Sequence, residues 1–508
     1  MDNFNDYLFD SYEIREKLVA DKFRPRYHFL PPEGRWNDLN GAIFWKGRYH
    51  LGYLQKITNG PNELDFSSWQ HISSRDLLHW TYHKASLREP LEGKKGDYFN
   101  SGDAMEGMDV PTIITNMPRR GICIYQCHDD NLDDWVPLPE NPVIPIEAGW
   151  NHLSKTLPAN AKYPESVIFD PSGWKEGDTY YALIGNKNHR LGYEGDSTSL
   201  FKSKDLKEWA YVGPFYKSDR KWTSEEEDCA CSDFFPFGQK HMLLMHTHRP
   251  ISKCQYYIGR YENERFIPEI NGQLSHLGSM LAGPETLIDD KGRRLFWGWI
   301  RDARDAEEVG WNSIMTLPWH FLPSSDNRLQ IHPVDELKAL RYDEKRVDDI
   351  HLLPKQEVRL DNLASDCMEL QLTIEPVDAQ QFGLKLLCSP DCEEETLITF
   401  DRQCNEFIID FENASRDRSL VYPCGPETLK RGNLKQRIPY PLGKNQALTL
   451  DIFVDRSVLE IFVNGDICIV QRVYPMREDS QEVRLFTKDS AMTVCNIVKW
   501  QMDATNAW

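Results

Sequence analysis

One carboxylate near the N-terminus is placed where it could do chemistry. Asp38 lies in a short polar turn, residues 37–41, which opens an aromatic, β-forming stretch over residues 42–53. The start of a strand is a position at which an all-β enzyme can hold a nucleophilic carboxylate. The turn could also be purely structural, because Asn40-Gly41 is a common turn dipeptide. The organisation of the rest of the chain decides between the two interpretations.

The arrangement around Asp38 recurs along the chain. Short aromatic or β-branched runs, separated by Gly, Asp and Pro turns, also follow Glu165, Ala230 and Glu285. Self-similar units at spacings of roughly 50–70 residues are typical of a β-propeller, in which each unit is one antiparallel sheet. The residue at the start of each inner strand would then point into the central channel. About five such blades fit into residues 24–330.

A second repeated element supports the propeller. Residues 76–80 and 205–209 share the pattern D-L-x-x-W, which we interpret as a corner at the end of an outer strand. A β-sandwich would also contain many short strands. A sandwich would not place a single polar residue at the same point before each strand.

The pattern changes after residue 333. Residues 334–341 are typical of a short linker helix, and strict alternation begins near residue 356, as in 369–374 and 448–454. Alternation over several strands favours a two-sheet sandwich. We therefore predict an all-β protein, a five-bladed β-propeller followed by a C-terminal β-sandwich. The predicted divisions are a helical extension 1–23, the propeller 24–333, a linker 334–355 and the sandwich 356–508.

Composition limits the partners. The chain has 508 residues and a formal net charge of −20, which argues against nucleic acid and anionic membranes. No run of about 18 apolar residues and no secretory signal is visible. The 12 cysteines are scattered, without the dense pattern of a small secreted scaffold. We expect a cytoplasmic protein with mostly free thiols, in which the sandwich face or the N-terminal extension could mediate a homo-oligomer.

No metal or cofactor is expected. The pair Cys229 and Cys231 lacks a second pair at zinc-finger spacing. The acidic run 225–228 lacks the alternating oxygen ligands and turn glycine of a calcium loop. No chemistry is assigned to four scattered histidines: His50, His71, His79 and His128.

Several motifs, in order along the chain, resemble those of glycoside hydrolase family 32, the β-fructofuranosidases, inulinases and levanases. Residues 35–41 resemble its W-N-D-P-N-G signature, with Leu39 in place of proline. Its last propeller blade is matched by residues 292–299 and 315–318. Its sandwich signature is matched by residues 451–465 and 472–475. The resemblance implies a retaining mechanism on fructosyl bonds, in which two carboxyl groups lie about 5 Å apart across the scissile bond.

By this resemblance Asp38 is the nucleophile, ionised and held by backbone donors of its turn. A third carboxylate, in an R-D-P motif, steadies the developing charge. We place it at Glu165 rather than Asp170, because Asp170 falls at a turn after a strand and would point away from the channel. The arginine of the motif is absent in either case, and Pro164 does not replace a guanidinium.

The acid/base glutamate of the family lies in W-E-C-P-D-F-F. Here residues 229–236 are C-A-C-S-D-F-F-P, so Ala230 occupies the position of the proton donor. An engineered Glu→Ala substitution and a natural loss both explain this, and we favour the first because the other motifs are retained. Glu227 or Asp228 is a third candidate for the role, from the preceding loop.

The resemblance also implies a set of substrate-binding residues. They are Asn37, Gln55, Trp69, Asn100, Ser101 and Asp233, for each of which turn or core packing is the alternative. The hypothesis is a retaining glycoside hydrolase that acts on a fructose-containing oligosaccharide or fructoside. A fructosyltransferase, including one that makes or cleaves difructose anhydrides, and a non-catalytic carbohydrate-binding paralogue are the alternatives.

Overall fold

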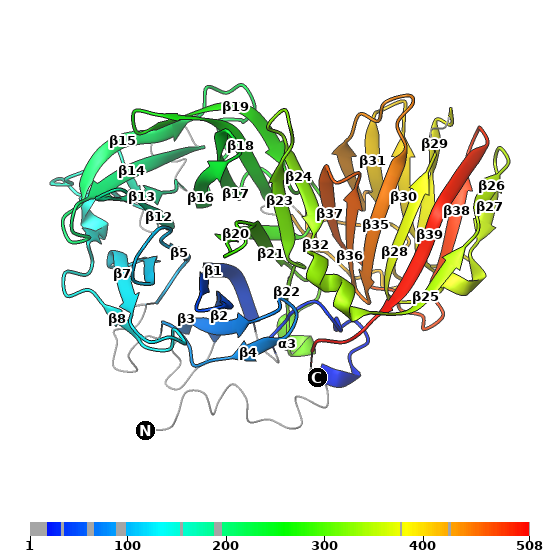
Figure 1. The fold of residues 1–508 in the computed structure, drawn as a ribbon, viewed down its shortest axis with the longest axis horizontal. Helices are drawn as coiled ribbons and strands as arrows, with labels where there is room; N and C mark the ends of the chain where they lie inside the picture. The colour runs from blue at the N-terminus through cyan, green and yellow to red at the C-terminus, as the bar shows by residue number, and fades with distance from the viewer. Residues whose placement is uncertain are drawn as a thin grey trace.

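The computed structural model describes residues 18–31, 35–57, 66–87, 98–152, 156–186, 196–375, 378–424 and 428–506. Within them almost every element is a strand, and the strands form two bodies side by side (Figure 1). One is a ring of small sheets and the other is a pair of larger sheets. The predicted all-β fold, a propeller followed by a sandwich, is confirmed.

The ring contains five antiparallel sheets, one for each predicted blade. Blade 1 is β1 (Arg35–Trp45), β2 (Arg48–Ile57), β3 (Phe66–Ser74) and β4 (Trp80–Tyr82). Blade 2 is β5 (Gly102–Ala104), β6 (Thr112–Met117), β7 (Gly121–Cys127) and β8 (Trp135–Pro137), with β9 (Ile144–Pro145) beside β7. Blade 3 is β12 (Pro171–Glu176), β13 (Thr179–Ile184), β14 (Ser197–Ser203) and β15 (Ala210–Lys217).

The last two blades complete the ring. Blade 4 is β16 (Ala230–Phe237), β17 (Lys240–Thr247), β18 (Lys253–Glu262) and β19 (Arg265–Gln273). Blade 5 is β20 (Leu281–Ile288), β21 (Arg294–Ile300), β23 (Trp319–Pro323) and β24 (Leu329–Pro333), with β22 (Ile314–Met315) on β21. The innermost strands β1, β5, β12, β16 and β20 contact one another in turn, and β20 closes the ring on β1 (Figure 1).

The predicted corner motif has one local structure in both copies. In blade 1, Asp76 Oδ1 accepts the backbone N–H of Leu78 at 3.0 Å and of His79 at 2.9 Å. In blade 3, Asp205 Oδ1 accepts the equivalent N–H groups of residues 207 and 208 at 2.9 and 3.0 Å. A third copy, which the sequence did not reveal, lies in blade 2 over residues 129–135. There the Asp129 carboxylate accepts the backbone N–H groups of residues 131, 133 and 134.

The sandwich is made of a seven-stranded and a six-stranded sheet. The first holds β25 (Arg341–Val347), β26 (Ile350–Leu352), β28 (Cys367–Ile374), β35 (Leu448–Asp455), β36 (Val458–Val463), β37 (Ile467–Arg472) and β39 (Met492–Met502). The second holds β27 (Glu357–Arg359), β29 (Gln381–Cys388), β30 (Thr396–Asp401), β31 (Glu406–Asp410), β34 (Lys435–Pro439) and β38 (Glu482–Thr487). The apolar faces of both sheets contribute to the largest buried core cluster.

The predicted linker 334–355 is wrong over most of its length. Its first part is a 3-10 helix, η3 (Asp335–Leu340), but β25 and β26 pair with β39 and belong to the sandwich. Strand β25 is an edge strand of charged, largely exposed residues. An edge strand of this kind carries no alternation of apolar residues, so the sequence pattern did not indicate it. Most of the predicted helical extension 1–23 lies outside the described residues.

Polar contacts join the two bodies. The Asp455 carboxylate, at the end of β35, accepts the backbone N–H groups of residues 26, 27 and 28 at 2.7 to 2.9 Å. Glu460, on β36, accepts the backbone N–H of Leu317 at 3.0 Å and the indole N–H of Trp319 at 2.7 Å. These two carboxylates therefore fix the sandwich against the segment before blade 1 and against blade 5.

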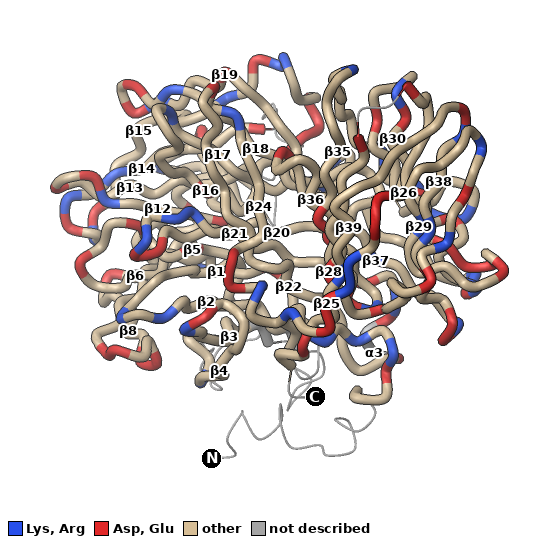
Figure 2. Tube along the Cα trace, turned by 45° about the vertical axis from the view of Figure 1, so that its right-hand side comes forward, with Lys and Arg blue, Asp and Glu red and all other residues tan. Residues whose placement is uncertain are grey.

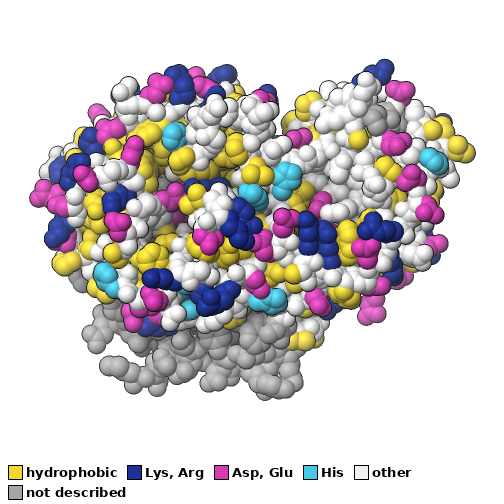
Figure 3. Space-filling view, in the orientation of Figure 1, with side chains coloured by type: hydrophobic (Ala, Val, Ile, Leu, Met, Phe, Trp, Pro, Cys, Tyr) yellow, Lys and Arg dark blue, Asp and Glu magenta, His cyan; other side chains and the backbone are white. Residues whose placement is uncertain are grey.

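Acidic and basic residues both occur on the outer loops of both bodies (Figure 2). On the face drawn in Figure 3, side chains of both signs lie among apolar and uncharged ones. In the described part of the chain, no helix is long and apolar enough to cross a bilayer.

Candidate active site

Asp38 lies on the innermost strand of blade 1, at one irregularity in the β1–β2 pairing, and a second irregularity follows between Asn40 and Ile43. Its Oδ2 accepts a hydrogen bond from the Ser101 hydroxyl at 2.9 Å, so the donor comes from blade 2 rather than from the expected turn amides. The side-chain amide of Asn40 donates to the backbone carbonyl of Asp38 at 2.8 Å, and its Oδ1 accepts the Gly102 N–H at 3.0 Å. The turn is thus clamped to the start of β5.

A glycine from blade 5 allows the close approach of this carboxylate. Gly283 has a φ of +49°, and a Cβ at this position would lie 2.8 Å from Oδ1 of Asp38. Only glycine fits this contact without moving the carboxylate. Sequence reasoning missed Gly283, since nothing local to β20 indicates that blade 5 meets Asp38.

A cation that the sequence did not indicate interacts electrostatically with Asp38. Burial lowers the pKa of Arg301, and the charge of Asp38 opposes this shift. The guanidinium lies 5.1 Å from the Trp299 ring centroid, and one of its nitrogens is 3.3 Å from Nε2 of His246. Arg301 therefore brings a positive charge to the same region as the carboxylate.

The two candidates for the third carboxylate, Glu165 and Asp170, lie in different environments. Glu165 is exposed in a turn, whereas Asp170 is buried and directly precedes the innermost strand β12. Asp170 and Asp38 together raise the pKa of the Cys231 thiol, after the larger effect of burial. The expectation that Asp170 follows the inner strand is wrong, because of the register of blade 3. Strand β11 (Val167–Ile168), which we took for the inner strand, instead pairs in parallel with β10 (Trp150–Asn151).

Asp170 is held by a residue that the sequence did not single out. The side-chain amide of Asn116, on β6, lies 3.4 Å from Oδ1 of Asp170. The Asn116 backbone exchanges hydrogen bonds with Asn100 and Ser101. Asn116 thus links the Asp170 carboxylate to the segment that provides Ser101.

Ala230 is the first residue of β16 and is fully buried. Its apolar neighbours are Val167 and Phe169. The next residue, Cys231, has a φ of 44°, and its thiol interacts with the Ser101 hydroxyl. Because burial raises the pKa of this thiol well above its ordinary range, it stays protonated and is a poor nucleophile.

The two acidic residues before β16 are engaged elsewhere. Glu227 Oε2 pairs with the Lys253 ammonium at 2.9 Å, and Asp228 Oδ2 pairs with Nδ1 of His248 at 3.0 Å. Both side chains are buried at the edge of blade 4. Their ion pairs argue against either residue as a substitute for the acid/base glutamate.

A second group of carboxyls lies further along the inner strands. Burial and the neighbouring Glu285 and Asp233 raise the pKa of Asp103 well above its ordinary range. Burial also raises the pKa of Asp233 to about 6, against the charge of Arg294. Glu285 accepts the Ala42 N–H at 2.8 Å, and its pKa is likewise raised by burial. Several carboxyls beside one guanidinium keep protons near neutral pH.

The other predicted binding residues occupy different environments. Trp69 is fully buried in the core between blades 1 and 2, and its indole N–H donates to the Asn100 carbonyl at 2.9 Å. Gln55 is buried at the end of β2. Asn37 and Asn100 are partly exposed. Trp69 therefore positions the segment 100–101 through packing.

Carboxylates at the axis of a five-bladed propeller, with a sandwich joined to it by polar contacts, define an all-β glycosidase. Family models agree over nearly the whole chain. The N-terminal domain model of glycosyl hydrolases family 32 matches residues 28–333, and the C-terminal model of the same family matches residues 336–501. The chain belongs to glycosyl hydrolase family 32.

Known proteins resemble the chain over almost its full length. A sucrose-6-phosphate hydrolase from Zymomonas mobilis is 26% identical over 97% of this chain and 94% of its own. An insoluble isoenzyme of beta-fructofuranosidase from Arabidopsis thaliana is 25% identical over 97% of this chain and 93% of its own. The crystal structure of fructan 1-exohydrolase IIa from Cichorium intybus has a TM-score of 0.77 at 19% identity, covering 95% of this chain and 98% of that chain, which shows the shared fold.

Proposed function

We propose that the propeller axis is a fructosyl site and that Asp38 is its nucleophile. The observation that carries this proposal is the constellation around Asp38, to which blades 2, 3 and 5 contribute residues. Ser101 donates to the carboxylate, Gly283 permits its approach, and Asp170 and Arg301 lie close by. The substrate-binding role of Asn37, Gln55, Asn100 and Asp233 remains part of the proposal.

The reaction follows from this geometry. A carboxylate oxygen of Asp38 bonds to the anomeric carbon of a fructosyl unit while the bond from that carbon to the leaving oxygen breaks. Asp170 stabilises the positive charge that develops on the sugar. Water or another hydroxyl then releases the sugar from Asp38. Both steps need a proton transfer, to the leaving oxygen first and from the attacking hydroxyl second.

We propose that the position of this proton transfer is residue 230. Alanine carries no exchangeable proton, and Glu227 and Asp228 are held in ion pairs. The chain as written should therefore turn over ordinary fructosides slowly, since general acid catalysis is worth about 10²–10⁴-fold. An engineered substitution and a natural loss lead to the same chemistry.

The test is fructose release by the chain beside its Ala230→Glu variant. The panel contains sucrose, inulin, levan, difructose anhydrides and sucrose 6-phosphate, the last because of the Zymomonas relative. We expect the variant to gain at least about 10²-fold on one substrate. Ala230→Gln is the matched control, because it adds nearly the same volume without a carboxyl group that can transfer a proton. An equal response to both substitutions would contradict the role of residue 230.

A substrate with a good leaving group tests Asp38 separately. Fluoride departs from fructosyl fluoride without protonation, so the unchanged chain should still form the fructosyl–Asp38 ester. Azide needs no general base, and it should release the sugar as fructosyl azide. An Asp38→Asn variant should lose this reaction. Tight sugar binding without any fluoride release would favour the non-catalytic paralogue.

Hydrolysis and fructosyl transfer use the same carboxylates. They differ in whether water or a sugar hydroxyl reaches the intermediate, and product analysis at high sugar concentration separates them. A related fructan 1-exohydrolase from Cichorium intybus has been solved in complex with 1-kestose, which supports a fructose-containing oligosaccharide as ligand. We also propose a cytoplasmic location, because no disulfide joins any of the 12 cysteines.

A further inference from the structure

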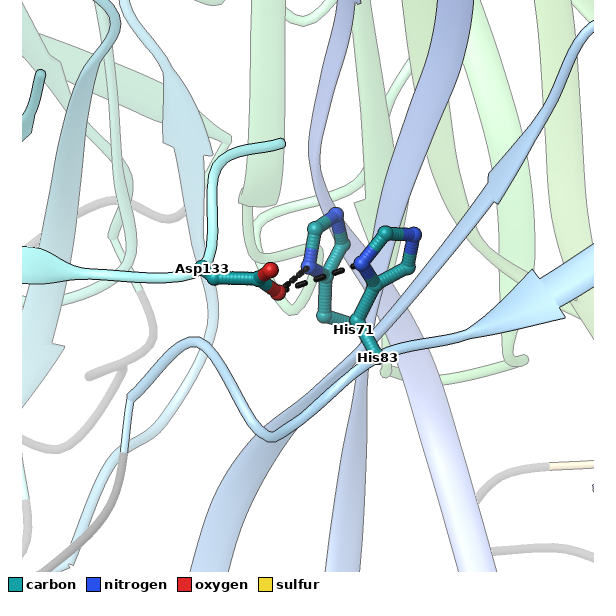
Figure 4. Close-up of side chains that lie close together, drawn as sticks. All are labelled: His71, His83 and Asp133. Carbon is teal, nitrogen blue, oxygen red and sulfur yellow. Dashed lines mark hydrogen bonds and ion pairs between the residues drawn. The ribbon is translucent and has the colours of Figure 1, made fainter. Parts of the chain in front are cut away.

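Two histidines and an aspartate converge between blades 1 and 2 (Figure 4). His71 lies on β3, His83 follows β4, and Asp133 lies in the corner before β8. One ligand atom from each residue lies within 4.8 Å of the other two. Asp133 Oδ1 is 3.1 Å from Nδ1 of His83 and 3.9 Å from Nδ1 of His71.

The His71 ring has one nitrogen in use and one without a partner. Its Nε2 is 2.9 Å from Nδ1 of His50. Its Nδ1 is buried and has no hydrogen-bond partner among the described residues, although it faces Asp133 (Figure 4). The side chain is only 3% exposed. A buried nitrogen in this state costs free energy unless something binds to it.

The other two groups are held in place by neighbours. The Ser73 hydroxyl lies 2.7 Å from Nε2 of His83 and also accepts a hydrogen bond from Arg48 at 2.9 Å. The backbone of Asp133 donates to Asp129 at 3.1 Å, as part of the blade 2 corner. Such partners of the distal nitrogen and of the ligand backbone orient ligands at metal sites.

We propose that His71, His83 and Asp133 bind a divalent transition metal ion of the zinc class, which links blade 1 to blade 2. In a tetrahedral zinc site with bonds of about 2.0–2.1 Å, neighbouring ligand atoms lie about 3.3 Å apart. The separations of 3.1 and 3.9 Å bracket this value. A plain hydrogen bond from His83 to Asp133 would explain the first distance but not the unpartnered nitrogen of His71.

The surrounding charges are compatible with a bound cation. Asp129 and Asp133 provide two carboxylates near His71, against the single guanidinium of Arg48. Burial keeps the His71 ring neutral, which leaves its Nδ1 lone pair available for a metal. The three residues leave a fourth position for water, and Asp133 is 29% exposed, so the ion can enter.

The experiment is a metal titration of the full chain after treatment with EDTA. We expect Zn²⁺ to bind one per chain by calorimetry, and Co²⁺ to give the visible absorption of a low-coordinate site with nitrogen and oxygen ligands. Zn²⁺ should also raise the melting temperature. Asp133→Asn and His83→Gln should each weaken Zn²⁺ binding at least tenfold and abolish the melting shift.

The control is His79→Gln, in the blade 1 corner, because His79 is exposed and pairs with Asp76. This variant should bind Zn²⁺ like the parent chain. The proposal is overturned if the parent chain binds no stoichiometric Zn²⁺, or if His79→Gln weakens binding as much as Asp133→Asn does. The titration of the parent chain decides the matter even where a variant fails to fold.

Discussion

At the scale of single residues, the candidate site depends on contacts that cross the ring. The Asp38 carboxylate meets Ser101 from blade 2 and Gly283 from blade 5. Sequence motifs indicated Asp38, Ser101 and the alanine at position 230. They did not indicate Gly283, Asn116 or Arg301, since each acts on a residue in another blade.

The contact with Gly283 can be tested directly. Gly283→Ala places a Cβ 2.8 Å from Oδ1 of Asp38 and forces alanine to a φ of +49°, so the carboxylate must move. A displacement of about 1 Å at a reacting group costs up to about 10²-fold in rate. We expect a loss of that order in fructosyl fluoride turnover, measured in the Ala230→Glu background.

Gly292→Ala is the control for backbone strain. Gly292 has a φ of +74°, but a Cβ there would meet nothing within 4 Å. This variant should keep nearly full activity. Equal losses in the two variants would mean that strain, and not the approach to Asp38, explains the effect.

At the scale of elements, the blade corner shows which parts of the fold a sequence reveals. The D-L-x-x-W pattern predicted two corners, and both form the same aspartate-capped turn. The copy in blade 2 has Asn131 instead of aspartate before its leucine, so the pattern missed it. In this copy the indole N–H of Trp135 nevertheless donates to the Leu132 carbonyl at 2.9 Å. The indole of Trp209 donates to the Leu206 carbonyl in the same way at 3.0 Å.

The cap of the blade 1 corner should contribute measurably to stability. Asp76→Ala removes the acceptor of two backbone N–H groups, which typically costs about 1 kcal/mol. We expect the melting temperature to fall by about 2 °C or less, given the size of the protein. Asp76→Asn keeps a side-chain oxygen and should lose less. A larger loss for asparagine than for alanine would contradict the capping role.

Blade 3 shows where local patterns fail. Residues 167–169 form a short apolar run that looks like an inner strand, but the inner strand begins at Pro171. This interpretation of the run is the reason that we expected the third carboxylate at Glu165 rather than at Asp170. Pairing partners decide which run is innermost, and β12 finds its partner in β13.

At the scale of the whole molecule, a buried histidine joins the two bodies. Nδ1 of His28 lies 2.9 Å from Asp455, and its Nε2 lies 3.4 Å from Glu460. Burial alone would lower the pKa of His28, but the hydrogen bonds with these two carboxylates raise it to about 9. The protonated imidazolium is thus the central charge of the interface between propeller and sandwich.

This raised pKa predicts a pH dependence of stability. The folded state holds the His28 proton up to about pH 9, whereas the unfolded chain releases it near pH 6.5. The contribution of the His28 proton to the free energy of unfolding is therefore complete below pH 6.5, and it is lost as the pH rises through 9. It amounts to no more than about 3 kcal/mol. The melting-temperature gap between the parent chain and His28→Gln should narrow from pH 6 to pH 9.5.

His79→Gln serves again as the control, because its histidine is exposed at the surface. Its gap from the parent chain should stay small at every pH. A gap for His28→Gln that stays constant from pH 6 to 9.5 would show that His28 is not protonated in the folded protein.

The repeat, the sandwich alternation, the family motifs and the missing carboxyl at position 230 are all visible in the sequence. These are local signals, encoded by residue types within one strand or turn. The register of blade 3, the approach of Gly283 to Asp38 and the contact of His71 with Asp133 are visible only once the chain is folded. Each joins side chains from different blades or pairs one strand with a remote partner, and alternation within a single strand carries no record of which distant strand will lie beside it.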